Sequence, residues 1–216
     1  MIRAACIAAA SLLVLSACES VPGYYTALEQ IGIEKRDLLV DRVQDTRGSQ
    51  KGAQEAFREA LDVYGRTGNA DAARLEQAYN RFNAAYDNAR DKAKAVESDI
   101  DSVNRVAADL FDEWQKELAR YQDPALRAAS ERQLRETRIR YDRMAAALKA
   151  AEAKMDPVLL LFRDRVLFLK HNLNAQAVAQ LRTEQTRIEG EVAGLVAELD
   201  QSIAEANRFI AEMKSG

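Results

Sequence analysis

The residue types that most often carry chemistry are scarce in this chain. His171 is the only histidine, and the two cysteines, Cys6 and Cys18, lie close to the N-terminus. A zinc site needs several histidine or cysteine ligands, and a serine hydrolase of the common kind holds its serine on a Gly-x-Ser-x-Gly turn, a motif that this sequence lacks. It also lacks the glycine-rich loops that bind phosphates. We therefore expect no enzymatic activity, no bound metal and no cofactor, with His171 as a polar residue at a helix end.

The N-terminus has the features of a secretion signal followed by a lipid-attachment site. Arg3 gives a positive start, and residues 4–15 form an apolar run that is too short for a stable membrane span. The tetrapeptide Leu15-Ser16-Ala17-Cys18 resembles the lipobox of bacterial lipoproteins, in which the cysteine is acylated and the chain is cut just before it. This resemblance predicts a cleaved signal peptide at 1–17 and lipidation of Cys18. The alternative is an ordinary signal peptide followed by a chance cysteine.

Lipidation at Cys18 carries further expectations. Cys6 would leave with the signal, so the exported chain would contain no disulfide. The acyl chains would hold the protein on a membrane, and the tether at 18–23 would reach about 20 Å from it. In the resembled class, an aspartate after the cysteine favours retention in the inner membrane, but Glu19 stands there. We therefore expect the outer membrane, on its periplasmic face, with the outer leaflet of the inner membrane as the alternative.

The rest of the chain, 24–216, should fold as one all-α domain. Of the 216 residues, 48% are hydrophobic, 30% charged and only 6% aromatic. No glycine occurs between Gly68 and Gly190, and no proline between Pro22 and Pro124, so the usual breaks between short elements are missing. With 31 basic and 34 acidic residues, the net charge of −3 leaves no basic excess for a nucleic-acid partner.

Two long helices are expected in the first half of this domain. The first should run from Tyr24 to Tyr64, with a weak polar stretch at Gln44–Gln54 that contains two glycines. A turn follows at Gly65–Asn69, with Gly65 as a left-handed cap. The second helix carries apolar residues at alternating steps of four and three, the heptad pattern of coiled coils. Its predicted buried row is Leu75, Tyr79, Phe82, Tyr86, Ala89, Ala93, Val96, Ile100, Val103, Ala107, Leu110 and Trp114.

The second half should contain a third helix that begins at Pro124, with Asp123 as its N-cap. Pro157 predicts a kink or a new start within it. The helix could end near His171–Asn174, which gives four helices of matching length, or near Arg182, which leaves a short fourth helix. We favour the first. The predicted fold is thus an all-α, elongated antiparallel helical bundle or coiled coil of three to four long helices.

The last helix shows one irregularity in its heptad pattern. Apolar residues follow one another in two consecutive steps of four, from Leu195 to Leu199 and from Leu199 to Ile203. Such a stutter predicts a local unwinding of the supercoil.

Two stretches of these helices resemble a known family. One is Glu34-Lys35-Arg36-Asp37-Leu38-Leu39-Val40-Asp41-Arg42-Val43, and the other is Phe162-Arg163-Asp164-Arg165-Val166-Leu167-Phe168-Leu169-Lys170-His171-Asn172-Leu173-Asn174-Ala175. Both look like signature stretches of domain of unknown function 2959, a proteobacterial family of envelope lipoproteins with coiled-coil character. The resemblance implies a helical periplasmic body in a Gram-negative source. It brings no activity, cofactor or partner.

A candidate interaction surface lies on these stretches and just beyond the first. Glu34, Asp37, Asp41 and Asp45 recur at steps of three and four, so they share one side of the first helix, where like charges repel. Neutralisation is the simpler interpretation, by Lys35, Arg36 and Arg42 on the same helix and by Arg163 or Arg165 from another helix. A surface for a partner or a divalent cation is the other. The full set is Glu34, Asp37, Asp41, Asp45, Arg163, Arg165, Lys170 and His171.

Arginines also gather at 127–143, interleaved with acidic residues. A solvated helix face explains them most simply. A patch for lipid headgroups is the alternative, because the turn at Asp123 should lie at the same end as the start of the first helix. Aromatic residues that suit a headgroup zone should gather there too: Tyr24, Tyr25, Trp114 and Tyr121. The arginines concerned are Arg132, Arg135, Arg138 and Arg140.

These features predict a lipid-anchored, non-enzymatic coiled-coil scaffold or adaptor that faces the periplasm. It should bind a protein partner or a second copy of itself through its helices, and the membrane through its anchor. The alternative function is a bundle that holds a lipid or an unfolded peptide between its helices. Gly190 and Gly194, with the leucine-rich 158–169, would allow either a pocket or closer helix packing.

Overall fold

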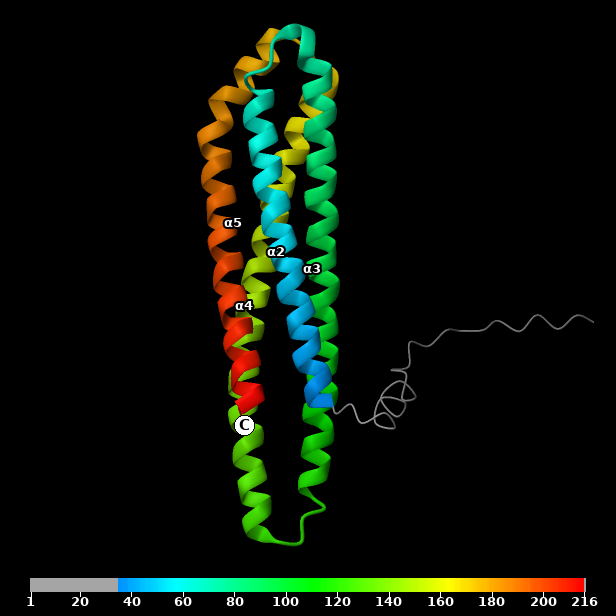
Figure 1. The fold of residues 1–216 in the computed structure, drawn as a ribbon, viewed down its shortest axis with the longest axis vertical. Coiled ribbons are helices and arrows are strands. Elements are labelled where there is room, and N and C mark those ends of the chain that lie inside the picture. Colours follow the sequence, from blue (N-terminus) through cyan, green and yellow to red (C-terminus); the bar gives the residue numbers. More distant parts are fainter. Residues whose placement is uncertain (1–34, 216) are drawn as a thin grey trace, which may run out of the picture. The chain divides into compact units, whose positions relative to one another are not determined.

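The computed structural model describes residues 35–215, and these residues are helical almost throughout (Figure 1). Four long helices follow one another along the chain, with a short 3₁₀ turn, η1, after the first. No strand occurs in the described range, so the all-α prediction is confirmed. The elements are α2 (Lys35–Thr67), η1 (Ala72–Arg74), α3 (Leu75–Leu118), α4 (Pro124–His171) and α5 (Ala175–Ser215).

The helices pack in a closed ring of neighbours. Contacts join α2 to α3, α3 to α4, α4 to α5, and α5 back to α2. Figure 1 shows successive helices running in opposite directions, so α2 and α4 point the same way. The hairpin of α3 and α4 extends past the start of α2 and the end of α5, at the bottom of the view. Those two ends are held by Lys35, which pairs with Glu113 at 2.8 Å, and by Arg36, which donates to the Met213 carbonyl.

The connections between the helices largely follow their capping residues. Asp123 accepts from the Ala125 amide at 2.7 Å, and Pro124 opens α4, as predicted. Asn174 accepts from the Ala177 amide at 3.0 Å and so caps α5. The break near His171–Asn174 is therefore confirmed, and the alternative near Arg182 is wrong.

The first turn lies later than we expected. Helix α2 continues past Gly65 to Thr67, so Gly65 is a helical residue and not a left-handed cap. The added turn is stabilised because Thr67 is buried and its hydroxyl donates to the Val63 carbonyl at 2.8 Å. Asp71 then caps η1 by accepting from the Arg74 amide at 3.1 Å.

The buried row of α2 passes straight through its polar stretch. We expected Gln44–Gln54 to be weak, but it is an unbroken helix whose polar residues lie at core positions. Gln50 is fully buried, and its amide donates to the Ser202 hydroxyl on α5 at 2.7 Å. The row keeps strict steps of four and three. Its members are Leu39, Val43, Thr46, Gln50, Ala53, Phe57, Ala60, Tyr64 and Thr67.

Ser202 also removes the predicted stutter of α5. Ser202 is fully buried, whereas Ile203 is only partly buried. Since the core position belongs to the serine, the steps of four and three continue without a doubled four. A sequence pattern that counts only apolar residues had skipped it. The buried row is Ile188, Val192, Leu195, Leu199, Ser202, Ala206, Phe209 and Met213.

Two further local expectations are corrected. Pro157 starts no new helix, since α4 is helical from Pro124 to His171 and the proline lies on the exposed side. Gly190 and Gly194 give no close packing, because a Cβ atom built on either would meet nothing within 4 Å.

Aromatic side chains fill the core at two levels. At one level, Phe82 meets Tyr64 and Phe162, with ring centroids 5.4 and 5.8 Å apart. At the other, Tyr141 meets Phe111 and Phe209 at 5.5 and 6.3 Å. The first cluster joins α2, α3 and α4 and thereby fixes the position of Tyr64.

Among the described helices, none has an apolar stretch of the length and purity that a bilayer-spanning segment needs.

Candidate functional site

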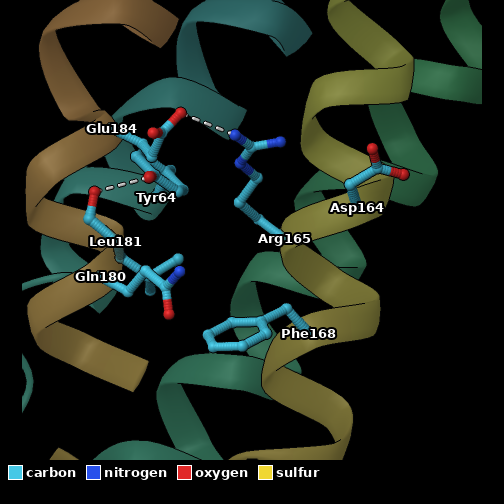
Figure 2. A pocket seen from close by; sticks show the side chains of 7 residues that line it. All are labelled: Tyr64, Asp164, Arg165, Phe168, Gln180, Leu181 and Glu184. Carbon is cyan, nitrogen blue, oxygen red and sulfur yellow. Dashed lines mark hydrogen bonds and ion pairs between the residues drawn. The ribbon is translucent and has the colours of Figure 1, made fainter. Parts of the chain in front are cut away.

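A small pocket opens between α4 and α5, with Tyr64 of α2 at its side (Figure 2). Its volume is about 230 Å³. Figure 2 shows Arg165 reaching from α4 toward Glu184 on α5, while Phe168 points into the gap below it. The lining is Tyr64, Asp164, Arg165, Phe168, Gln180, Leu181 and Glu184.

The charges of this pocket are already compensated. Arg165 donates to Glu184 at 2.9 Å, and Arg187 donates to the same carboxylate oxygen at 2.6 Å. The hydrogen bond from Arg187, followed by the charge of that guanidinium, lowers the pKa of Glu184. An incoming anion or cation would have to compete with these pairs, so the charges serve mainly to join α4 to α5.

Tyr64 is held as a neutral hydrogen-bond donor. Its hydroxyl donates to the Leu181 carbonyl at 2.7 Å, and its side chain is 1% exposed. Burial raises the pKa of the Tyr64 hydroxyl to about 12, and the charge of Arg165 offsets only part of this rise. A phenol with such a pKa stays protonated at neutral pH and is poorly suited to act as a base.

The candidate interaction surface divides into two groups. Asp37, Asp41 and Asp45 lie on the first three turns of α2, whereas the basic residues lie on the last three turns of α4. Arg165 reaches the level of Tyr64, which is 23 residues and about 35 Å along α2 from Asp41. The seven of these residues that the structure describes therefore do not form one surface. Glu34 lies outside the described residues.

The predicted neutralisation of the acidic row by Arg163 or Arg165 is wrong. Arg165 pairs with Glu184, and Arg163 contacts its neighbour Asp164 at 3.4 Å. Asp45 pairs with Arg42 on its own helix at 3.2 Å, as predicted. The local part of the predicted neutralisation is thus confirmed at Asp45, and the part that involves another helix is not.

The arginines at 127–143, predicted as a solvated face or a headgroup patch, lie on α4 in its hairpin with α3. Arg140 pairs with Glu212 at 3.6 Å, and the Arg138 guanidinium lies 5.0 Å from the centre of the Phe111 ring. The indole of Trp114 donates to the Ser130 hydroxyl at 2.8 Å, which joins the two helices of the hairpin. Tyr24, Tyr25 and the predicted lipid site Cys18 lie outside the described residues.

Carboxylates meet without a matching number of cations in the middle of the α3–α4 contact. Burial, followed by the charges of Glu97, Asp101 and Asp156, raises the pKa of Glu152. Lys149 opposes this rise, and Arg90 and Lys94 line the same shallow pocket. No group of acidic residues in the described part of the chain has a geometry suited to hold a metal ion.

Sequence reasoning missed an apolar line on the outer side of α4. Leu160 is 47% exposed and Leu167 is 49% exposed. The signal was present in the leucine-rich 158–169, where apolar residues are more frequent than one buried row requires. We had assigned that excess to a pocket or to close packing, whereas these two leucines face solvent.

The comparisons with known proteins agree with the resemblance found in the sequence. The family model described as a protein of unknown function, DUF2959, matches residues 24–213. No curated protein and no solved structure matches the chain. Because the family model covers most of the sequence, including all four long helices, the chain belongs to the DUF2959 family.

Proposed function

We propose that this protein is a lipid-anchored, non-enzymatic adaptor of the bacterial envelope, which uses the outer faces of its helices to bind other components. Cys18 would carry the lipid and hold the bundle on the periplasmic face of the outer membrane. The support for the anchor is the order of positive start, apolar run and lipobox at 1–18.

The observation that carries the adaptor role is a core filled along its length by side chains. Each long helix contributes ten or more buried residues to it. The pocket between α4 and α5 has about 230 Å³, less than the roughly 300 to 1,000 Å³ of ordinary ligand sites. Two larger hollows, of about 430 Å³ beside Phe111 and about 420 Å³ beside Thr67, are lined mostly by exposed residues. Recognition then falls to the outside of the bundle, where helix faces can take up partner helices.

Crosslinking in intact cells tests the adaptor role. The wild-type chain should capture the same neighbouring proteins in repeated experiments, identified by mass spectrometry. A chain in which Cys18 is replaced by alanine should lose those neighbours, because without cleavage and acylation it should not reach the outer membrane. Capture of neither a partner nor a second copy by the wild type would contradict an adaptor.

The second candidate is a bundle that holds a lipid or an unfolded peptide. The feature that favours it is the opening beside Tyr64, where Phe168 offers an apolar surface. The ring contacts of Tyr64 and Phe82 would have to separate for a lipid chain to enter the core. Solvent extraction of the purified protein should therefore yield no stoichiometric lipid, and a tightly bound lipid in the mass spectrum would favour this candidate over the adaptor.

A further inference from the structure

The outer side of α4 carries a short apolar line with charges of opposite sign on its two sides. Leu160 and Leu167 are seven residues apart, which is close to two helical turns. Each is nine residues, or two and a half turns, from a fully buried residue: Leu160 from Leu169, and Leu167 from Val158. The two leucines therefore point directly away from the core of the bundle.

Arg163 and Asp164 flank this line between the leucines. At about 100° per residue, Arg163 lies roughly 60° to one side of Leu160 and Asp164 roughly 40° to the other. Both side chains are exposed, and they touch each other at 3.4 Å within one chain. The face thus has two apolar contacts one heptad apart, with a cation on one flank and an anion on the other.

We propose that this face is where two copies of the protein pair, with their α4 helices side by side and parallel. A two-fold axis along the helices would place Leu160 against Leu160 and Leu167 against Leu167 of the second copy. The same axis brings the side of each helix that carries Arg163 to the side of the other helix that carries Asp164. Arg163 of each copy then meets Asp164 of the other, which gives two reciprocal ion pairs beside the leucines.

The parallel orientation is set by the same charges. In an antiparallel pair, each flank would meet its own counterpart, so Arg163 would face Arg163 and Asp164 would face Asp164. Like charges at such positions oppose pairing. The parallel arrangement also suits two chains tied at the same end, and here the inference rests on the proposed lipid anchor.

The pairing should be weak for free molecules and stronger on a membrane. A single helix contact over about three turns buries much less than the roughly 1,200 to 2,000 Å² of a stable protein interface. Tethering both copies to one surface raises the effective concentration of each for the other. The anchor therefore determines how much of the protein is paired, while the face on α4 determines how it pairs.

Disulfide trapping in membranes tests the geometry. Full-length chains with Leu160→Cys or Leu167→Cys should each form a disulfide-linked dimer after mild oxidation, whereas a mixture of the two should give little of the mixed species. Leu126→Cys, at a leucine that is 57% exposed at the other end of α4, is the matched control and should give only background, as should the chain without an added cysteine. A dominant mixed species, or no dimer at either position, would overturn the inference.

Charge reversal tests the proposed ion pairs between Arg163 and Asp164 of the two copies. In the Leu160→Cys chain, Arg163→Asp or Asp164→Arg alone should lower the dimer yield roughly fivefold, since each creates two like-charge contacts. The double variant restores complementary charges and should recover most of the yield. Two single losses without recovery in the double variant would show that the flanks do not meet as proposed.

A measurement without the lipid separates this inference from the proposed anchor. The purified chain 19–216, which lacks both the signal and the lipid-bearing cysteine, should show a dimer in sedimentation velocity only as its concentration rises. Leu160→Gln with Leu167→Gln should remove that dimer, and Leu126→Gln should leave it unchanged. A 19–216 chain that stays monomeric at millimolar concentration would contradict the α4 pairing, even if the wild type proves to be lipidated.

Discussion

The buried pair of Gln50 and Ser202 offers the sharpest test of the core. The Gln50 amide donates to Ser202 at 2.7 Å, but its carbonyl oxygen Oε1 is buried and has no partner among the described residues. An unpaired buried acceptor costs about 1 to 3 kcal/mol, whereas the hydrogen bond to Ser202 contributes about 1 kcal/mol. Together, the unpaired oxygen and the hydrogen bond should therefore lower stability by up to about 2 kcal/mol.

This reasoning predicts opposite signs for two variants. Ser202→Ala alone should lower the free energy of unfolding by about 1 to 3 kcal/mol, because it leaves the Gln50 amide unpaired as well. Gln50→Leu combined with Ser202→Ala should raise it above the wild-type value by about 1 to 2 kcal/mol, since the position lies in a heptad row where leucine fits. For a chain of this size the double variant should gain roughly 2 to 8 °C in Tm.

Urea unfolding followed by circular dichroism gives the required free energies. Gln54→Leu is the matched control, because Gln54 lies one turn further on and donates at 2.8 Å to Asp200, which is exposed. Its effect should stay within about 1 kcal/mol. A double variant that is less stable than the wild type would refute our account of the layer and indicate that Oε1 is satisfied in solution.

Three further outcomes are expected from the described contacts. Gly190→Ala and Gly194→Ala should each raise stability by about 0.5 to 1 kcal/mol in thermal unfolding, because both are helical and the added methyl group meets open space; a loss would show a close neighbour. Tyr64→Phe should cost about 1 kcal/mol in urea unfolding through the lost bond to Leu181, and an unchanged midpoint would contradict that bond. The raised pKa of Glu152 means that folding favours the protonated form of this carboxyl group, so its ionisation destabilises the bundle at neutral pH. This loss of stability fades as the pH falls toward 4.5, the ordinary pKa of a glutamate. Glu152→Gln should therefore be more stable than the wild type at pH 7, with a difference that shrinks on acidification, and a constant difference between pH 7 and 4.5 would contradict the assignment.

Helix positions follow from sequence because local rules decide them here. Asp123 before Pro124, and Asn174 before the last helix, supply caps that need no tertiary context. The apolar pattern of the third helix also predicts most of its buried row, since all of its members except Tyr141 are buried, and Tyr141 is partly buried. The buried members are Leu134, Met144, Leu148, Ala151, Met155, Val158, Phe162, Val166 and Leu169. The family was likewise evident from two short stretches.

The errors arose where a tertiary contact replaces a local preference. Gln50 and Ser202 are core residues only because each meets the other across α2 and α5. Arg165 could not be assigned to Glu184 rather than to the acidic row without knowing which ends of the helices meet. Leu160 and Leu167 were read as part of one apolar run, since a run alone does not show which leucines face the core.

The most direct test of the proposed lipid anchor is whether the chain is cleaved before Cys18 and acylated at that residue in cells. Membranes and soluble fractions should be separated from cells that produce the wild type or Cys18→Ala, and the N-terminal peptide analysed by mass spectrometry. The proposal predicts that the wild type begins at an acylated Cys18 and sediments with the outer membrane, whereas Cys18→Ala loses both the acyl mass and the cleavage before residue 18. A wild-type peptide with an unmodified cysteine, or a Cys18→Ala chain that is cleaved and membrane-bound like the wild type, would contradict a lipid-anchored adaptor.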